Sequence, residues 1–152
     1  MPKIDLSTVP VKTGSVYPAP YDAEMEGRSS LRIGDAGGMS QFGANLVTLN
    51  PGAKSSLRHW HQYEDELVMV TEGFLTLVED SGSVVLTAGE FAAFPAGVKN
   101  GHHFVNHSET KAAFLVIGAR ERDEYVEYSD VDMKATAQNG NYVFTRKDGS
   151  EF

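Results

Sequence analysis

Short apolar runs separated by turn signals set the strongest limit on how this chain can fold. Between residues 46 and 118 the turn signals recur at nearly even spacing, and each contains glycine. They fall at 50–52, 72–73, 80–82, 87–89 and 95–97. Glycine, proline, asparagine and aspartate favour tight turns, and no long stretch shows the apolar periodicity of a helix. The pattern therefore predicts an all-β protein, an antiparallel sandwich or barrel.

Length and composition limit the classes of function. At 152 residues the chain is expected to form a single domain, spanning 1–152. A formal net charge of −8 argues against a nucleic-acid partner or an anionic membrane. The chain has no cysteine, which excludes disulfides, thiolate zinc sites and a cysteine nucleophile. No apolar run resembles a signal peptide or reaches membrane-spanning length, so we expect a cytoplasmic protein with no membrane partner.

The two ends of the chain differ from the middle. Residues 1–30 are polar and rich in proline, which favours extended backbone over helix. We interpret them as an arm lying across the body or a partner subunit; a loose tail is the alternative, and Tyr17 and Tyr21 favour the packed arm. Residues 119–152 are charged and are expected to form an irregular extension. Within it, 125–128 has the weak alternation of an edge strand, and Asn139-Gly140 signals a hairpin before 142–145.

A His-x-His motif is the strongest chemical signal. Successive side chains of a strand point to opposite faces, so His59 and His61 share a face. The polar residues 62–65 are enough for a hairpin loop, which would bring Glu66 beside the two imidazoles. Two imidazoles and a carboxylate at that range form a three-sided site for a divalent metal ion.

The alternative to a metal site is a pair of solvated or hydrogen-bonded histidines, which is the common state of isolated His-x-His pairs. The distribution of histidine favours metal. The chain has five histidines, and none lies in the first third or the last quarter. A second group, His102, His103 and His107, follows the Pro-x-Gly turn at 95–97. His107 is expected to be a surface residue.

These residues resemble the two motifs of the cupin superfamily, over about residues 40–118. The first motif is Gly, His-x-His, Glu and Gly, and the second is Gly, Pro-x-Gly, His and Asn. The matching residues are Gly52, His59, His61, Glu66 and Gly73, then Gly89, Pro95, Gly97, His102 and Asn106. The resemblance implies a double-stranded β-helix, or jelly-roll barrel. It also implies one divalent ion (Zn, Mn, Fe or Ni) on His59, His61, Glu66 and a fourth ligand.

The spacing departs from the family pattern in two places. Six residues separate Gly52 from His59 where the pattern has five. Four residues separate Gly97 from His102 where it has two, and the strictly spaced position is Asn100. The fourth ligand therefore lies among His102, His103 and Asn100, and the spacing from histidine to Asn106 favours His102.

Several neighbouring side chains carry weaker expectations. Glu64 and Asp65 are expected to face solvent, and Arg58 and Trp60 to point away from the metal. The weak candidates for catalysis are His103, Glu64 and Tyr63. The cations available to an anionic substrate are Lys54, Lys99, Arg58, Arg120 and Arg122. Nothing in the sequence orders them into a phosphate site.

The resemblance leaves three classes of function open. The favoured one is a metal-dependent isomerase or epimerase of a sugar or sugar phosphate, in which the metal acts as a Lewis acid. The second is an Fe(II)-dependent dioxygenase. The third is a non-catalytic protein that binds a small ligand. Similarity to single-domain cupins also implies a homodimer, in which the N-terminal arm adds a strand to the partner's sheet.

Overall fold

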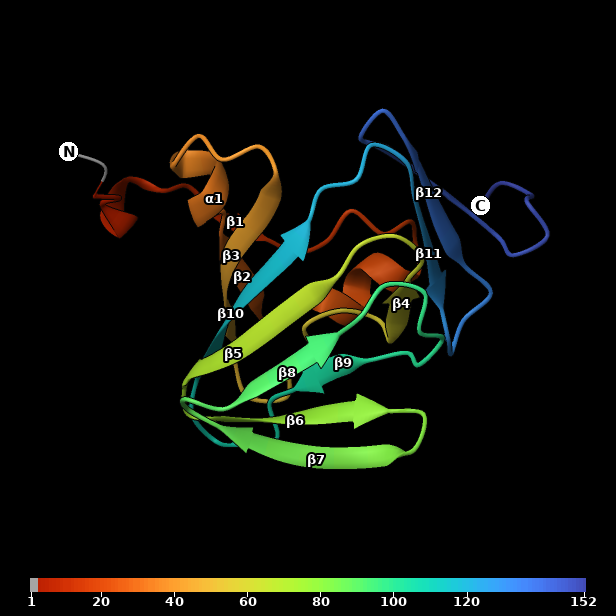
Figure 1. The fold of residues 1–152 in the computed structure, drawn as a ribbon. Coiled ribbons are helices and arrows are strands. Elements are labelled where there is room, and N and C mark those ends of the chain that lie inside the picture. The colour runs from red at the N-terminus through yellow and green to blue at the C-terminus, as the bar shows by residue number, and fades with distance from the viewer. Residues whose placement is uncertain (1–2) are drawn as a thin grey trace.

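The computed structural model describes residues 3–152, and its strands lie in three antiparallel sheets around a shared interior (Figure 1). The largest sheet has the order β1-β2-β3-β10-β5-β8. Its strands are β1 (Val11–Thr13), β2 (Arg28–Leu31), β3 (Phe42–Leu49), β10 (Ala112–Ala119), β5 (Glu66–Glu72) and β8 (Phe91–Phe94). The expected all-β jelly-roll barrel is confirmed.

Two smaller sheets close the rest of the barrel. One has the order β13-β12-β11-β4 and the other β7-β6-β9. Their strands are β4 (His59–His61), β6 (Phe74–Glu79), β7 (Gly82–Thr87), β9 (His103–Val105), β11 (Glu124–Tyr128), β12 (Lys134–Gln138) and β13 (Asn141–Thr145). Within residues 3–152, helical turns are confined to η1 (Leu6–Thr8), η2 (Tyr21–Met25) and α1 (Ile33–Ala36). No helix in residues 3–152 is long and apolar enough to cross a membrane.

The main core follows from strand alternation. Along β6, Leu75 and Leu77 are buried, while Thr76 between them is only half-buried. Val47, Val70 and Phe114 meet in register across β3, β10 and β5. Complete burial of one such apolar side chain stabilises the fold by about 1.5–3 kcal/mol. The turn after β5 needs Gly73, which has φ of 70° and leaves only 3.2 Å between an added Cβ and Cβ of Ala112.

A second core joins the two ends of the chain. It is built from Met25, Leu57, Val126, Tyr128, Met133 and Ala135, with Tyr17, Tyr21, Val131 and Phe144 against it. The N-terminal segment is thus a packed arm, although residues 1 and 2 lie outside the described part. Its strand β1 pairs with β2 of the same chain and forms one edge of the largest sheet, and the expectation that the arm extends a partner's sheet stays a prediction. The homodimer stays a prediction.

The C-terminal segment is not irregular, and this part of the sequence-based expectation is wrong. Its three strands are regular, and β11 is a central strand between β12 and β4, not an edge strand. Buried Val126 and Tyr128 explain why the charged segment still packs. The hairpin at Asn139-Gly140 is confirmed, and both residues have positive φ, 53° and 80°.

The expected hairpin between the His-x-His strand and Glu66 is also absent from the described residues. Strand β4 pairs with β11, whereas β5 pairs with β10 and β8. The loop at 62–65 therefore crosses from one sheet to another. Glu66 still comes to lie near the imidazoles, because the two sheets meet at this edge of the barrel.

Candidate metal centre and its cavity

Four potential metal ligands converge where the sheets meet. His59 and His61 project from the same face of β4, and their ring centroids lie 5.0 Å apart. His102 pairs with His59 in an isolated β-bridge, which sets their ring centroids 4.9 Å apart. Glu66, the first residue of β5, places Oε2 at 3.0 Å from Nε2 of His102 and 3.8 Å from Nε2 of His61. The sequence-predicted set is therefore brought together, with His102 beside the carboxylate.

His59 is fixed in the form that a metal requires. Its Nδ1 lies 2.8 Å from the carbonyl oxygen of Leu57. A carbonyl can only accept, so Nδ1 carries the proton and Nε2 keeps its lone pair. Burial, together with nearby His61, lowers the pKa of His59 to about 3. The imidazole is therefore neutral at neutral pH, which is the state that binds a metal ion.

Buried polar atoms without partners mark the same place. In residues 3–152 these atoms are both ring nitrogens of His61, Nδ1 of His102 and Oε2 of Glu124. Leaving a buried polar atom unsatisfied costs about 1–3 kcal/mol. Burial would raise the pKa of Glu66, but the hydrogen bond from His102 and the nearby imidazoles outweigh it and hold that pKa at about 2. A buried carboxylate that stays ionised beside imidazole nitrogens fits a divalent cation.

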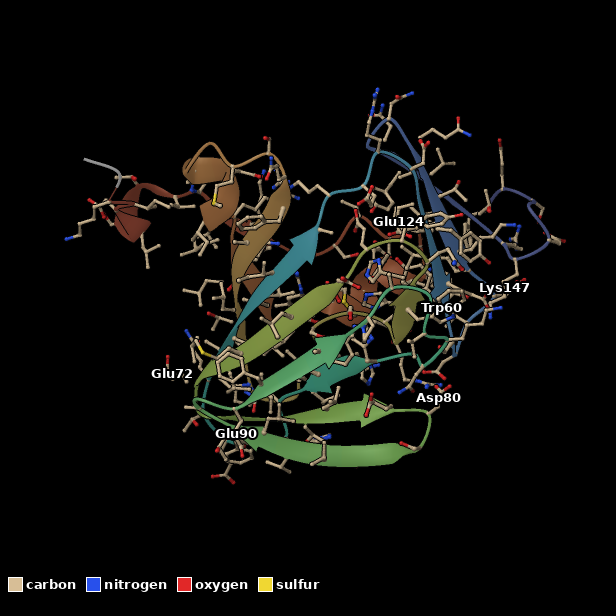
Figure 2. All side chains as sticks on the ribbon, in the orientation of Figure 1. Trp60, Glu72, Asp80, Glu90, Glu124 and Lys147 are labelled. Atoms are coloured by element: carbon tan, nitrogen blue, oxygen red, sulfur yellow. The ribbon has the colours of Figure 1, made fainter. Side chains whose placement is uncertain are left out.

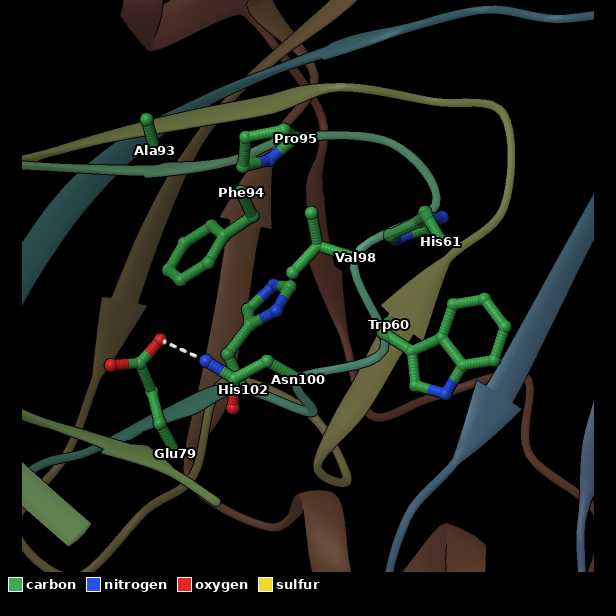
Figure 3. A pocket seen from close by; sticks show the side chains of 9 residues that line it. All are labelled: Trp60, His61, Glu79, Ala93, Phe94, Pro95, Val98, Asn100 and His102. Atoms are coloured by element: carbon green, nitrogen blue, oxygen red, sulfur yellow. Dashed lines mark hydrogen bonds between the residues drawn. The ribbon is translucent and has the colours of Figure 1, made fainter. Parts of the chain in front are cut away.

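His102 is held from behind by an aromatic ring. The rings of Phe94 and His102 stack with centroids 3.5 Å apart and an interplanar angle of 4° (Figure 3). His61 and His102 also line a small cavity of about 80 Å³, together with Trp60 and Asn100. The stacking limits rotation of the imidazole, so His102 is positioned before any ligand binds.

Two further carboxylates lie near Nδ1 of His61. Carboxylate oxygens of Glu64 and Glu124 each lie 3.9 Å from its Nδ1. Glu124, labelled in Figure 2, is buried, and its Oε1 accepts from the backbone N–H groups of Gln62, Tyr63 and Tyr125. The expectation that Glu64 faces solvent is wrong, because its side chain is 13% exposed and burial raises its pKa to about 7. Asp65 is exposed as expected and accepts from the N–H of Ala96.

The other proposed catalytic and ligand residues lie elsewhere. Tyr63 is 57% exposed, and neither it nor His103 lines the large cavity described below. Nδ1 of His103 donates to the carbonyl of Ser56 at 3.1 Å. The amide of Asn100 donates to Glu79 at 2.9 Å (Figure 3), and its oxygen accepts from the N–H of Asp80, so both groups are occupied. Buried Asn106 donates to the carbonyls of Leu49 and Thr110, which is a structural role.

The cations that sequence analysis offered to a substrate are engaged with other residues and do not line the large cavity. Arg58 pairs with Asp80 and Asp130, and it points away from the histidines as expected. Buried Trp60 also points away, and Lys99 lies over its ring at 5.6 Å. The remaining pairs are Lys54 with Glu24, Arg120 with Asp35, and Arg122 with Asn139.

The large cavity has a volume of about 510 Å³, and the four potential ligands form part of its wall. Tyrosines from the arm and the C-terminal sheet line it as well, namely Tyr17, Tyr128 and Tyr142. Sequence analysis missed Arg28, Ser30 and Arg32, which also line it. The missed signal was their period of two, which indicates one face of a strand.

Comparison with known proteins places this geometry in a family. A cupin domain model matches residues 45–118. A search of curated proteins gave no match. A sugar phosphate isomerase of the cupin superfamily from Silicibacter pomeroyi is similar at 56% identity and a TM-score of 0.97, over 99% of this chain and 96% of that one.

Two more distant structures extend the comparison. A protein from Acidithiobacillus ferrooxidans, described as a sugar phosphate isomerase, has 26% identity and a TM-score of 0.75, over 90% and 95% of the two chains. The polyketide cyclase RemF from Streptomyces resistomycificus has 22% identity and a TM-score of 0.63, over 80% of each chain, and supports the fold alone. The motif spacing, the barrel and the first of these relatives together show that the chain belongs to the cupin superfamily.

Proposed function

We propose that the protein binds one divalent metal ion through His59, His61, Glu66 and His102 and acts as an isomerase or epimerase of a sugar or sugar phosphate. The observation that carries the proposal is that donor atoms of His59, His61 and Glu66 lie within 4.8 Å of one another, with His102 bonded to Glu66, in the wall of a 510 Å³ cavity. Three neutral imidazoles and one carboxylate suit Zn, Mn, Fe or Ni. With a divalent ion the group has a net charge of +1, which favours oxygen-rich and anionic ligands.

The chemistry of an isomerase fits this donor set. A bound divalent ion would polarise a carbonyl or adjacent hydroxyls of the substrate as a Lewis acid. The chain itself would orient the sugar through the cavity wall. Burial raises the pKa of Tyr17 and that of Tyr128, so both phenols stay protonated and supply uncharged hydroxyl groups to the cavity wall. The rings of these two residues meet edge to face at 5.4 Å, which fixes their positions.

The similar structures support the substrate class. The relatives from Silicibacter pomeroyi and Acidithiobacillus ferrooxidans are both described as sugar phosphate isomerases. At 56% identity over nearly the whole chain, the first shares enough of the barrel to make the same class of substrate the leading hypothesis. Cupins with the same ligands perform different reactions, so the reaction needs a direct test.

The test is a set of isomerisation assays on protein purified without chelator and loaded separately with Zn, Mn, Fe or Ni. Aldose and ketose phosphates are incubated in D₂O and followed by NMR. We expect interconversion, with exchange at the carbon next to the carbonyl, in at least one metal form and none after chelation. Oxygen consumption with catechols or 2-oxo acids, and no turnover of sugars, would show a dioxygenase and contradict the proposal.

A further inference from the structure

One wall of the cavity carries positive charge in an ordered row. Arg28 and Ser30 lie on the inner face of β2, and Arg32 continues their period just past the end of that strand. Ser30 pairs with Lys12 on β1 and with Val47 on β3, so these positions share its face. Lys12 and Asn45 also line the cavity. The five polar side chains thus form one patch on the inside of the six-stranded sheet.

The cationic side chains of this patch have few acidic partners. Within residues 3–152, Arg28 and Lys12 take part in no ion pair, whereas Arg58, Lys54 and Arg120 each do. Among the described residues Arg32 forms one ion pair, with Asp35 at 3.9 Å, and both side chains are more than 40% exposed. Exposed pairs of this kind contribute little. The patch therefore holds guanidinium groups that are free to bind an anion.

Arg28 is also set in place before a ligand arrives. Its Nε donates to the carbonyl of Ser55 at 2.7 Å, which leaves the two terminal nitrogens for another partner. Burial lowers the pKa of Arg28, which reflects the cost of a desolvated charge with no counter-ion. A guanidinium that is held through Nε and keeps both terminal nitrogens free suits bidentate recognition of phosphate.

The charge of the whole cavity points the same way. The chain has a net charge of −8, yet the part of the cavity wall within residues 3–152 contains three cationic side chains and one carboxylate, Glu66. Glu66 belongs to the candidate metal centre. A cavity whose charged wall residues are mostly cationic, in a protein that is acidic as a whole, favours an anionic ligand.

The patch lies within reach of a small molecule at the metal ligands. Strand β2 stands three positions from β5, so the two strands lie about 14 Å apart along the sheet. In register Arg28 is opposite Leu49, toward the end of the sheet away from Glu66, and Arg32 follows Leu31, nearer the level of Glu66. The segment that Arg28 binds continues to Ser56, whose Oγ lies 3.4 Å from Nδ1 of His59. A molecule of several carbons can therefore touch both regions at once.

We propose that Arg28, Ser30 and Arg32 form the subsite that binds the phosphate group of the substrate while its sugar end lies at His59, His61, Glu66 and His102. The assignment rests on the proposed function for the identity of the sugar end. Lys12 and Asn45 complete the subsite. Its specificity is for phosphate esters over the corresponding neutral sugars.

The first experiment uses inorganic phosphate and metal-free protein, so it does not depend on the metal. Binding is measured by calorimetry for wild type, Arg28→Gln, Arg32→Gln and the control Arg122→Gln. Arg122 is exposed and bonds only to Asn139 among the described side chains. We expect Arg28→Gln to weaken phosphate binding about tenfold to a hundredfold and the control to leave it unchanged. Equal binding by all four proteins overturns the proposal.

The second experiment compares an aldose phosphate with the same sugar lacking phosphate, on metal-loaded protein. We expect wild type to prefer the ester and Arg28→Gln to lose that preference while keeping its affinity for the neutral sugar. An equal loss for both sugars would mean that Arg28 only supports the loop before His59, and the subsite would be wrong. Tighter binding of a sugar acid than of the phosphate ester would also overturn the assignment to phosphate.

Arg32→Gln tests the subsite without risk of a folding defect, since Arg32 is exposed and its loss does not disturb the bond from Arg28 to Ser55.

Failure of the subsite proposal can be distinguished from failure of the proposed function. Isomerisation that is insensitive to both arginine variants removes the subsite and keeps the proposed function. Selective phosphate-ester binding without isomerisation keeps the subsite and removes the proposed function.

Discussion

The candidate metal centre and the cationic patch around Arg28, Ser30 and Arg32 share one cavity, but the sequence predicted only the metal centre. The metal centre uses histidine, of which the chain has five, at a spacing that few other sites share. The patch uses Lys and Arg, of which there are 13, and most of those described serve other contacts. A rare residue type in a fixed spacing reveals a site, whereas a common type reveals one only when the fold shows which charges lack partners.

The largest effect expected from this comparison is on metal binding. His59→Ala removes a ligand that Leu57 holds in the correct tautomer, and we expect metal affinity to fall by more than about a hundredfold, beyond the effect of losing an outer contact. His107→Ala is the matched control, because His107 is exposed. Elemental analysis and competition with a chelating dye measure both. Equal metal content in the two variants would contradict the assigned ligands.

The second effect separates the two regions. Arg32→Gln removes an exposed cation from the patch, and we expect the affinity for a sugar phosphate to fall by about tenfold. Metal affinity should stay within about threefold, because Arg32 is not among the grouped metal donors. Calorimetric titration with the metal ion measures the metal affinity, and titration with the phosphate ester measures the ester affinity. A parallel loss of both would mean that the two regions are one structural unit, not two subsites.

A smaller effect is expected on the outer side of His61. Glu64→Gln keeps the size of the side chain and removes a carboxylate that lies 3.9 Å from Nδ1 of His61. Loss of such an outer contact should weaken metal binding by about tenfold or a little more, well below the loss in His59→Ala. The same chelator competition measures it. A loss as large as that of His59→Ala would indicate that the metal lies with Glu64 and Glu124.

The smallest effect is expected at Tyr63, where the sequence suggested a phenol that could reach the substrate. Its side chain is 57% exposed and does not line the cavity. Tyr63→Phe should therefore leave kcat and KM for a sugar phosphate unchanged in steady-state assays. A clear drop in kcat would show that the loop at 62–65 closes over the substrate.

The barrel could be predicted from the sequence because its turns are local. Glycine at 52, 73, 89 and 97 has positive φ in each case, and the same turns set the spacing of the cupin motifs. The C-terminal sheet could not be predicted in the same way. Strand β11 pairs with β4 across more than 60 residues, so its place depends on long-range contacts such as Val126 opposite His61.

The candidate site was predictable in part for the same reason. Glu66 follows the His-x-His strand closely, and its approach to His61 was expected, but through a hairpin that the described residues do not form. Burial of Glu64 and the row from Arg28 to Arg32 depend on how the sheets fold around the cavity. The local spacing of residues in the sequence predicts neither the burial of Glu64 nor the absence of a counter-ion beside Arg28.

The central claim is most directly tested by anomalous diffraction from crystals grown with Mn or Zn. The account predicts one strong peak among His59, His61, Glu66 and His102, with the side chains of Glu64 and Glu124 outside the coordination sphere. A peak between His61, Glu64 and Glu124, which form the alternative group of potential ligands, would contradict it. So would the absence of any peak in the cavity at saturating metal.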